Sequence, residues 1–108
     1  IRDFYDGIAK FDFNQLCNKN LGAEDYLKIS QKCKFIVIEN IPSFSEENSN
    51  QQQRFITLID ILYERKIYLM VSMEKSLDSI GSSKKLVESF KRTSSRLFEL
   101  TSPNTKIL

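Results

Sequence analysis

The sequence contains no histidine among its 108 residues. Histidine is the commonest general base and the commonest zinc ligand, so its absence excludes Ser-His-Asp chemistry and a histidine-based structural zinc site. The two cysteines, Cys17 and Cys33, cannot complete a tetrahedral metal site by themselves. One disulfide between them is the alternative to free thiols. Because the start of the sequence is not signal-like, we expect reduced, partly buried thiols in a reducing compartment.

Glycine, proline and long apolar runs are also scarce. Three glycines and two prolines, with 41% hydrophobic and 28% charged residues, give the balance of a globular protein and not of a disordered or fibrous one. No apolar run approaches the ~18 residues of a membrane span, so we expect no transmembrane segment. The length suits a single domain, 1–108, and the first residue, Ile1, leads us to expect a portion of a longer chain.

An excess of charge of one sign is missing as well. Sixteen basic and fourteen acidic residues leave a net charge of +2. A dedicated nucleic-acid binder usually carries a much larger positive charge, which attracts the phosphate backbone. We therefore expect no nucleic-acid partner. The three glycines, Gly7, Gly22 and Gly81, have neither the spacing nor the following lysine of a phosphate-binding P-loop, so the chain has no phosphate cradle of its own.

The hydrophobic pattern alternates between strand-like and helix-like segments. The strand-like segments are 9–15, 35–38 and 67–73, and we expect 9–15 to be an outer strand. The helix-like segments are 23–32, 51–66, and a last helix from 82 or 83 to about 100. Between them we expect a polar loop over 43–52 and a short turn or helix over 76–80, with a frayed tail over 103–108.

The middle of the chain carries the strongest structural signal. The run 35–38 is continuously apolar and predicts a central strand covered on both faces, as parallel strands usually are. In the helix that follows, Phe55, Leu58, Ile59 and Leu62 recur at helical spacing. Strand, helix and strand together are long enough for a crossover between parallel neighbours. The sequence therefore predicts an α/β fold with a small, mostly parallel sheet, flanking helices and a C-terminal helix.

Several polar residues stand out against this framework. Asp60 lies in the most apolar helix and needs a partner, for which Arg65 and Ser72 are our candidates. Arg54 begins the same helix, where the helix dipole does not favour a cation. Glu39 ends the apolar strand as a magnesium-binding carboxylate does in P-loop ATPases, but without a phosphate cradle we interpret it as a strand-end residue.

The last helix carries a charged stripe in which Lys84, Glu88, Arg92 and Arg96 follow one another every four residues, with Glu99 three residues further on. One interpretation is a solvated helix face. The other is a nucleotide-sensing or subunit-contacting role, because arginine suits bidentate phosphate recognition. Within the second interpretation we favour Arg96, since Glu88 lies one turn before Arg92 as a ready partner, whereas Glu99 follows Arg96 in the less favourable order.

A set of short motifs recurs in order along the chain. They are Phe11-Asp12-Phe13, Leu16-Cys17, Leu21-Gly22-Ala23, Asp25-Tyr26-Leu27, Ile41-Pro42, the stretch RFITLIDILY over 54–63 and the stretch RTSSRLFEL over 92–100. In this order they resemble the C-terminal part of the ZapE and lactation-elevated family of AAA+-type P-loop ATPases, over residues 9–102. The sequence departs from the family pattern at Asn20, Gln53, Glu64, Met73 and Leu100, and Gln53 stands where a second arginine usually precedes Arg54.

The resemblance implies an ATP hydrolase that acts in cell division in bacteria or in protein quality control in mitochondria. The compartment would then be the bacterial cytoplasm or the mitochondrion. ATP and magnesium are implied for the full-length protein, but the family's P-loop lies in the N-terminal half, so we expect this chain to hold no cofactor and to be inactive alone. The implied partners are its own N-terminal ATPase portion, further copies in a homo-oligomer and a protein client.

The resemblance also suggests roles for individual residues. Arg92, Arg96 and Arg54 would sense the nucleotide or contact a neighbouring subunit, while Asp60 and Asp25 would be structural polar residues. No catalytic residue and no metal ligand is assigned to this chain. The alternative function is a stand-alone α/β protein-interaction module that has no nucleotide chemistry.

Overall fold

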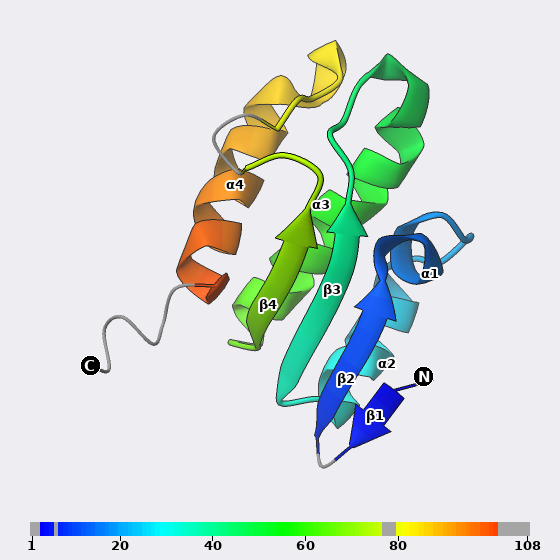
Figure 1. Ribbon diagram of the computed structural model, residues 1–108, viewed down its shortest axis with the longest axis vertical. Coiled ribbons are helices and arrows are strands. Elements are labelled where there is room, and N and C mark those ends of the chain that lie inside the picture. Colours follow the sequence, from blue (N-terminus) through cyan, green and yellow to red (C-terminus); the bar gives the residue numbers. More distant parts are fainter. Residues whose placement is uncertain (1–2, 6, 77–79, 102–108) are drawn as a thin grey trace.

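The sheet has four strands in the order β1-β2-β3-β4 (Figure 1). The computed structural model describes residues 3–5, 7–76 and 80–101. Strand β1 (Asp3–Tyr5) runs antiparallel to β2 (Ile8–Asp12), which is parallel to β3 (Phe35–Ile41), itself parallel to β4 (Tyr68–Met73). The predicted α/β fold with a small, mostly parallel sheet is confirmed, and β3 has the expected central place.

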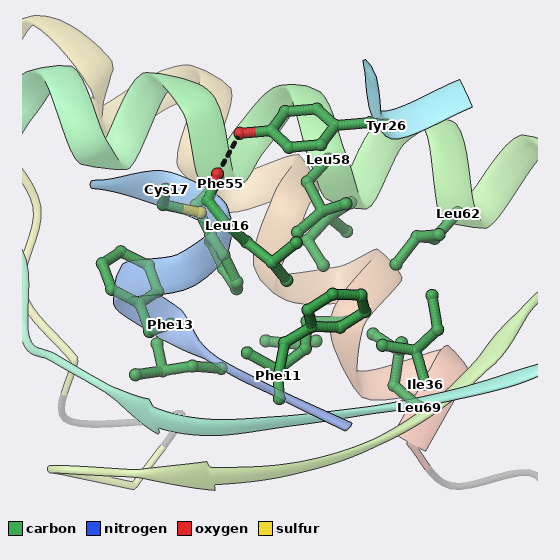
Figure 2. Close-up of a cluster of buried hydrophobic side chains, with 14 of the residues drawn as sticks. Phe11, Phe13, Leu16, Cys17, Tyr26, Ile36, Phe55, Leu58, Leu62 and Leu69 are labelled. Carbon is green, nitrogen blue, oxygen red and sulfur yellow. Dashed lines mark hydrogen bonds between the residues drawn. The ribbon is translucent and has the colours of Figure 1, made fainter. Parts of the chain in front are cut away.

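Helices lie between the parallel strands along the chain, and one more helix follows the last strand. They are α1 (Phe13–Cys17), α2 (Ala23–Lys32), α3 (Ser49–Glu64) and the C-terminal α4 (Val87–Thr101), with 3-10 turns at η1 (Glu46–Asn48) and η2 (Lys84–Leu86). Figure 1 shows α2 and α3 behind the sheet and α4 next to β4. Along the edge of the sheet, Figure 2 shows the helices on one side of the strands, with the buried side chains between the two layers.

The core between these layers is rich in aromatic rings. Phe44 packs against Phe13, Phe55 and Phe90, with ring centroids 5.5–5.7 Å apart. Such tilted and edge-on arrangements are the favoured geometries of aromatic pairs. Phe44 therefore joins α1, α3 and α4 from a segment that we expected to be a polar loop.

Within the described residues, strand 35–38 is covered on one face only, and not on both as we predicted. Ile36 and Ile38 are buried under the helices, whereas Phe35 and Val37 point to the opposite face and stay partly exposed. Successive side chains of a strand point to opposite faces, so a continuous apolar run does not reveal whether both faces are covered.

The predicted outer strand 9–15 is wrong in its end and in its place. The strand ends at Asp12, whose carboxylate accepts a hydrogen bond from the Asn14 backbone N–H at 3.0 Å, while the Asp12 N–H donates to the Gln15 side chain at 2.7 Å. This capping box starts α1, so Phe13 is buried from a helix. Because β1 pairs with its other side, β2 is not an edge strand.

Other boundaries follow from local caps. The predicted helix 23–32 is confirmed as α2. The loop predicted over 43–52 is shorter than expected, because the Ser45 hydroxyl accepts from the Glu47 N–H at 3.3 Å and starts η1, and α3 then begins at Ser49. Most of the turn predicted at 76–80 and the predicted tail 103–108 lie outside the described residues.

Candidate functional site

Within the described residues, two ion pairs join α3 to α4. Tyr63 follows Asp60 by three residues on α3, and Arg92, Arg96 and Glu99 are spaced by four and three residues on α4. These spacings place each set on one helix face. We call these five residues, Asp60, Tyr63, Arg92, Arg96 and Glu99, the arginine cluster.

Asp60 and Arg96 form the tightest ion pair of the cluster. Nη1 of Arg96 donates to Oδ1 of Asp60 at 2.8 Å, and the two side chains are 24% and 33% exposed, respectively. The Arg96 guanidinium carbon also lies 4.7 Å from the centre of the Tyr63 ring, a cation–π contact. The Tyr63 hydroxyl in turn donates to the Glu99 carboxylate at 3.3 Å. Arg96 is therefore held on two sides and locks α4 to α3.

This pairing corrects the partners that we predicted for Asp60. Asp60 reaches α4 instead of Arg65 or Ser72. The Ser72 hydroxyl accepts a hydrogen bond from the Asn40 backbone N–H at 2.8 Å, away from α3. The distance along the sequence between Asp60 and Arg96 hid the contact, because the packing of the two helices creates it.

Arg92 is held more loosely than Arg96. Its Nη2 lies 3.8 Å from Oδ2 of Asp60, and its side chain is 59% exposed. The expectation that Glu88 pairs with Arg92 is wrong, since the Glu88 carboxylate accepts a hydrogen bond from Lys91 Nζ at 3.2 Å while Arg92 leans toward α3. Two guanidinium groups thus share one carboxylate, and the outer one retains free donors toward solvent.

The other two predicted site residues lie outside this cluster. Arg54 Nη1 donates to the backbone carbonyl of Cys17 at 3.0 Å, at the end of α1. A cation is well placed at the carbonyl end of a helix. The Asp25 carboxylate accepts from the Gly22 N–H at 2.9 Å at the start of α2. The structure therefore brings Asp60, Arg92 and Arg96 together and leaves Arg54 and Asp25 at helix ends.

Both cysteines are free and buried, as we expected. Burial raises the pKa of the Cys17 thiol to about 12, although the nearby Tyr26 hydroxyl and Arg54 act in the opposite direction. Burial also raises the pKa of Cys33. A thiolate is the reactive form of cysteine, so neither thiol has the character of a nucleophile at neutral pH.

Sequence reasoning missed a polar group at the carboxyl ends of the parallel strands. Asn40 has a backbone φ of +64°, its side-chain amide donates to Asp12 Oδ1 at 2.6 Å, and its N–H donates to Ser72. The hydrogen bond from Asn40 and a further one from the Asn14 backbone lower the pKa of Asp12. Polar residues at the ends of three adjacent strands were the available signal, because the carboxyl ends of parallel strands meet at one edge.

A pocket of about 300 Å³ lies next to this group, lined by Asn40, Pro42, Ser72, Met73 and Glu74. Glu39, one residue before Asn40, instead pairs with Lys10 Nζ at 3.7 Å. Within residues 3–5, 7–76 and 80–101, no three carboxylate or cysteine side chains gather to hold a metal ion. In the same part of the chain, no helix has the length and apolar character needed to cross a membrane.

Comparison with known proteins identifies relatives along most of the chain. Lactation elevated protein 1 homolog B of Danio rerio is 36% identical over 73 residues, which are 68% of this chain and 14% of that protein. An uncharacterized protein of Schizosaccharomyces pombe is also 36% identical over 73 residues, 68% of this chain and 16% of its own length. Cell division protein ZapE of Escherichia coli K12 is 32% identical over 90 residues, 83% of this chain and 24% of ZapE.

The chain thus spans between 14% and 24% of the length of the relatives that it matches. No solved structure shows a significant match to it. The family model of the AFG1-like ATPases matches residues 1–106, and two of the relatives bear the names of the family whose motifs the sequence resembles. We conclude from this nearly complete match that the chain belongs to the AFG1-like ATPase family.

Proposed function

We propose that this chain is the C-terminal portion of a ZapE-like, AAA+-type ATPase and contributes an arginine to the nucleotide site or to a subunit interface. Family membership and the small fraction of each relative that the chain spans support this placement. The full protein would hydrolyse ATP to remodel a protein client or, like the relative named as a cell division protein, to act in division. Its compartment would be the bacterial cytoplasm or the mitochondrion.

The position of Arg92 is the observation that carries the proposal. Arg96 neutralises Asp60 at 2.8 Å, so the carboxylate has little left to offer Arg92 at 3.8 Å. Arg92 therefore presents a half-exposed guanidinium, and the contact between Arg96 and Tyr63 fixes the position of the α4 segment that carries it. A guanidinium held in this way can bind a phosphate through two parallel N–H donors.

Our proposal reverses the order in which we ranked the two arginines. Arg96 is committed to Asp60 and Tyr63, and its release would break the contact between α3 and α4. Arg92 can turn to an anion at the loss of one long ion pair. Arg92 is thus the phosphate contact in our proposal, and Arg96 is a positioning residue.

The rest of the ATP site would lie outside this chain. Bound ATP and magnesium supply the phosphoryl group to be transferred and the cation that neutralises its charge. The described residues offer neither a glycine-rich phosphate loop nor a cluster of carboxylates for the cation. The fit of this chain to the nucleotide is therefore partial, with Arg92 providing positive charge and the family's P-loop portion providing the cradle.

ATP turnover of the family-length enzyme tests this proposal. Arg92→Ala should lower turnover by about tenfold or more with an unchanged melting temperature, because charge stabilisation of a transferred phosphoryl group is a large transition-state contribution. Arg96→Ala should lower both turnover and melting temperature. Lys91→Ala is the matched control, since Lys91 is an exposed cation on the same helix. Normal turnover of the Arg92→Ala enzyme would show that Arg92 belongs to a solvated helix face.

A further inference from the structure

The sheet face opposite the helices carries an apolar band. Strand register places Ile8, Phe35 and Tyr68 in one row across β2, β3 and β4. The next row on the same face holds Lys10, Val37 and Met70. We call the five apolar members of these rows the open face: Ile8, Phe35, Val37, Tyr68 and Met70.

The open face is substantially exposed to solvent. Ile8 is 49% exposed, Tyr68 44% and Met70 61%, and Phe35 and Val37 are partly exposed between them. Single exposed apolar side chains are ordinary on protein surfaces, but a contiguous set usually marks an interface. The apolar side chains of the open face are such a contiguous set, because they lie in two adjacent rows across β2, β3 and β4.

The open face has a defined border. In the next row toward the carboxyl ends of the strands, Asp12 lies opposite Glu39 in the strand register. The Glu39 carboxylate forms the ion pair with Lys10. An apolar band that ends at charged side chains has the composition of an interface core beside its polar rim.

The parallel arrangement of the strands supplies a second argument. Parallel sheets occur almost entirely with both faces covered by helices. In the described residues, α2, α3 and α4 lie on one face (Figures 1 and 2). A second helical layer on this face would come from outside this part of the chain.

We propose that the open face is covered by helices from the remaining portion of a family-length polypeptide. Most of each relative lies outside the stretch that this chain matches, because that stretch is 14–24% of their length. Helices on the same polypeptide are present at a high effective concentration near the open face, whereas a second copy of the chain would have to bind from solution. The inference rests on the part of the proposed function that places this chain in a longer ATPase, and not on the role of Arg92.

The covering segment is identified by its chemistry. It would be an amphipathic helix whose apolar side chains recur at i, i+3, i+4 and i+7 and pack on the rows of Ile8 and Met70. The Lys10–Glu39 pair would remain at the margin, where both charges keep contact with water.

Thiol labelling tests the inference without measuring ATP turnover. Met70→Cys and, as a matched control, Lys91→Cys are each made in the 108-residue chain and in the polypeptide encoded at its natural length. Lys91 is 69% exposed on α4, in the helical layer. The native cysteines are buried. In the 108-residue chain both new thiols should react quickly with a maleimide.

In the natural-length polypeptide, Met70→Cys should react about tenfold or more slowly, because labelling then requires the interface to open, whereas Lys91→Cys should keep its rate. Equal rates at Met70→Cys in both proteins would overturn the proposal, as would a natural polypeptide with no further portion. Protection of Met70→Cys that rises with the concentration of the 108-residue chain would also overturn it, by identifying a second copy as the occupant.

A charge substitution gives an independent readout. Met70→Lys should leave the melting temperature of the 108-residue chain unchanged, since the side chain is in solvent. The same substitution should lower the melting temperature of the natural-length protein, because an unpaired ammonium would be buried. Equal melting behaviour of the Met70→Lys variant in both proteins would count against a covered face.

Discussion

At the scale of single residues, the partners of the arginines show what spacing along a helix can indicate. Glu88 lies four residues before Arg92, and this spacing favoured a pair between them, yet Arg92 turns toward Asp60 on another helix. A pair at i, i+4 on a solvated helix contributes only about 0.2–0.5 kcal/mol. Such a weak preference is easily overridden once a carboxylate from α3 lies within reach.

The buried thiol of Cys17 predicts a loss of stability at alkaline pH. Its pKa is raised from an ordinary 9.0 to about 12, mainly by burial, and burial also raises the pKa of Tyr26, whose hydroxyl donates to the Leu16 carbonyl (Figure 2). The unfolded chain ionises first, so the stability contribution is complete below pH 9 and disappears as the pH rises toward 12.

Thermal unfolding measured between pH 8 and pH 11 checks this prediction. The melting temperature should fall above about pH 9, and less steeply in a Cys17→Ala variant, which has lost one of the two ionisable groups. An identical pH dependence in the two proteins would show that ionisation of Cys17 makes no contribution to the loss.

At the scale of elements, the end of α3 has an unusual residue in a common motif. Lys66 has a φ of +58°, the Ile67 N–H donates to the Leu62 carbonyl at 2.9 Å, and the Lys66 N–H donates to the Tyr63 carbonyl at 3.1 Å. These two bonds define a Schellman motif, in which glycine usually takes the left-handed position. Lysine carries a Cβ there and is strained.

Lys66→Gly should therefore stabilise the protein by about 0.5–1 kcal/mol, because glycine adopts positive φ without a steric penalty. Chemical denaturation of the variant measures the change in the free energy of unfolding. Lys66→Ala is the matched control and should bring no gain, since alanine keeps the Cβ. A gain of equal size with alanine would mean that loss of the lysine charge, and not backbone strain, is responsible.

The packing of α3 on the sheet predicts a large effect in the opposite direction. Leu58 and Ile59 are 1% and 0% exposed in the core between α3 and the strands. Leu58→Ala should cost about 2–5 kcal/mol of unfolding free energy, as cavity-forming core substitutions do. Thr57→Ala, one residue earlier on a partly exposed position, should cost far less. Similar losses for both variants in denaturant titrations would contradict the assigned helix face.

At the scale of the whole molecule, the chain is one layer of helices on one sheet. Its glycines do not form a phosphate-binding loop, and among the described residues the Arg92 guanidinium has no second group beside it that could surround a triphosphate. A guanidinium alone contributes to a nucleotide site that other parts of the protein must build.

The 108-residue chain by itself should therefore release no phosphate from ATP above a no-protein control, with or without magnesium, because nothing in its sequence can surround the phosphates. A steady-state phosphate-release assay measures this, and the natural-length protein serves as the positive control. Turnover by the 108-residue chain that survives further purification and is lost in an unfolded sample would falsify the prediction.

The sequence alone determined the class of fold and the family. Helix α2 and the apolar face of α3 were predictable because helical periodicity is local and each apolar stripe is several turns long. The family was predictable because RFITLIDILY and RTSSRLFEL keep their order along the chain. Strand β1, with three residues, was too short for any period to be visible.

The tertiary structure alone decided which residues meet and which face is free. Asp60 and Arg96 are 36 residues apart, and only the packing of α4 on α3 brings them to 2.8 Å. The exposure of Tyr68 and Met70 likewise depends on which side of the sheet the helices occupy. An apolar run has the same pattern whether one face or both faces are covered, because coverage depends on where distant segments pack and not on the strand itself.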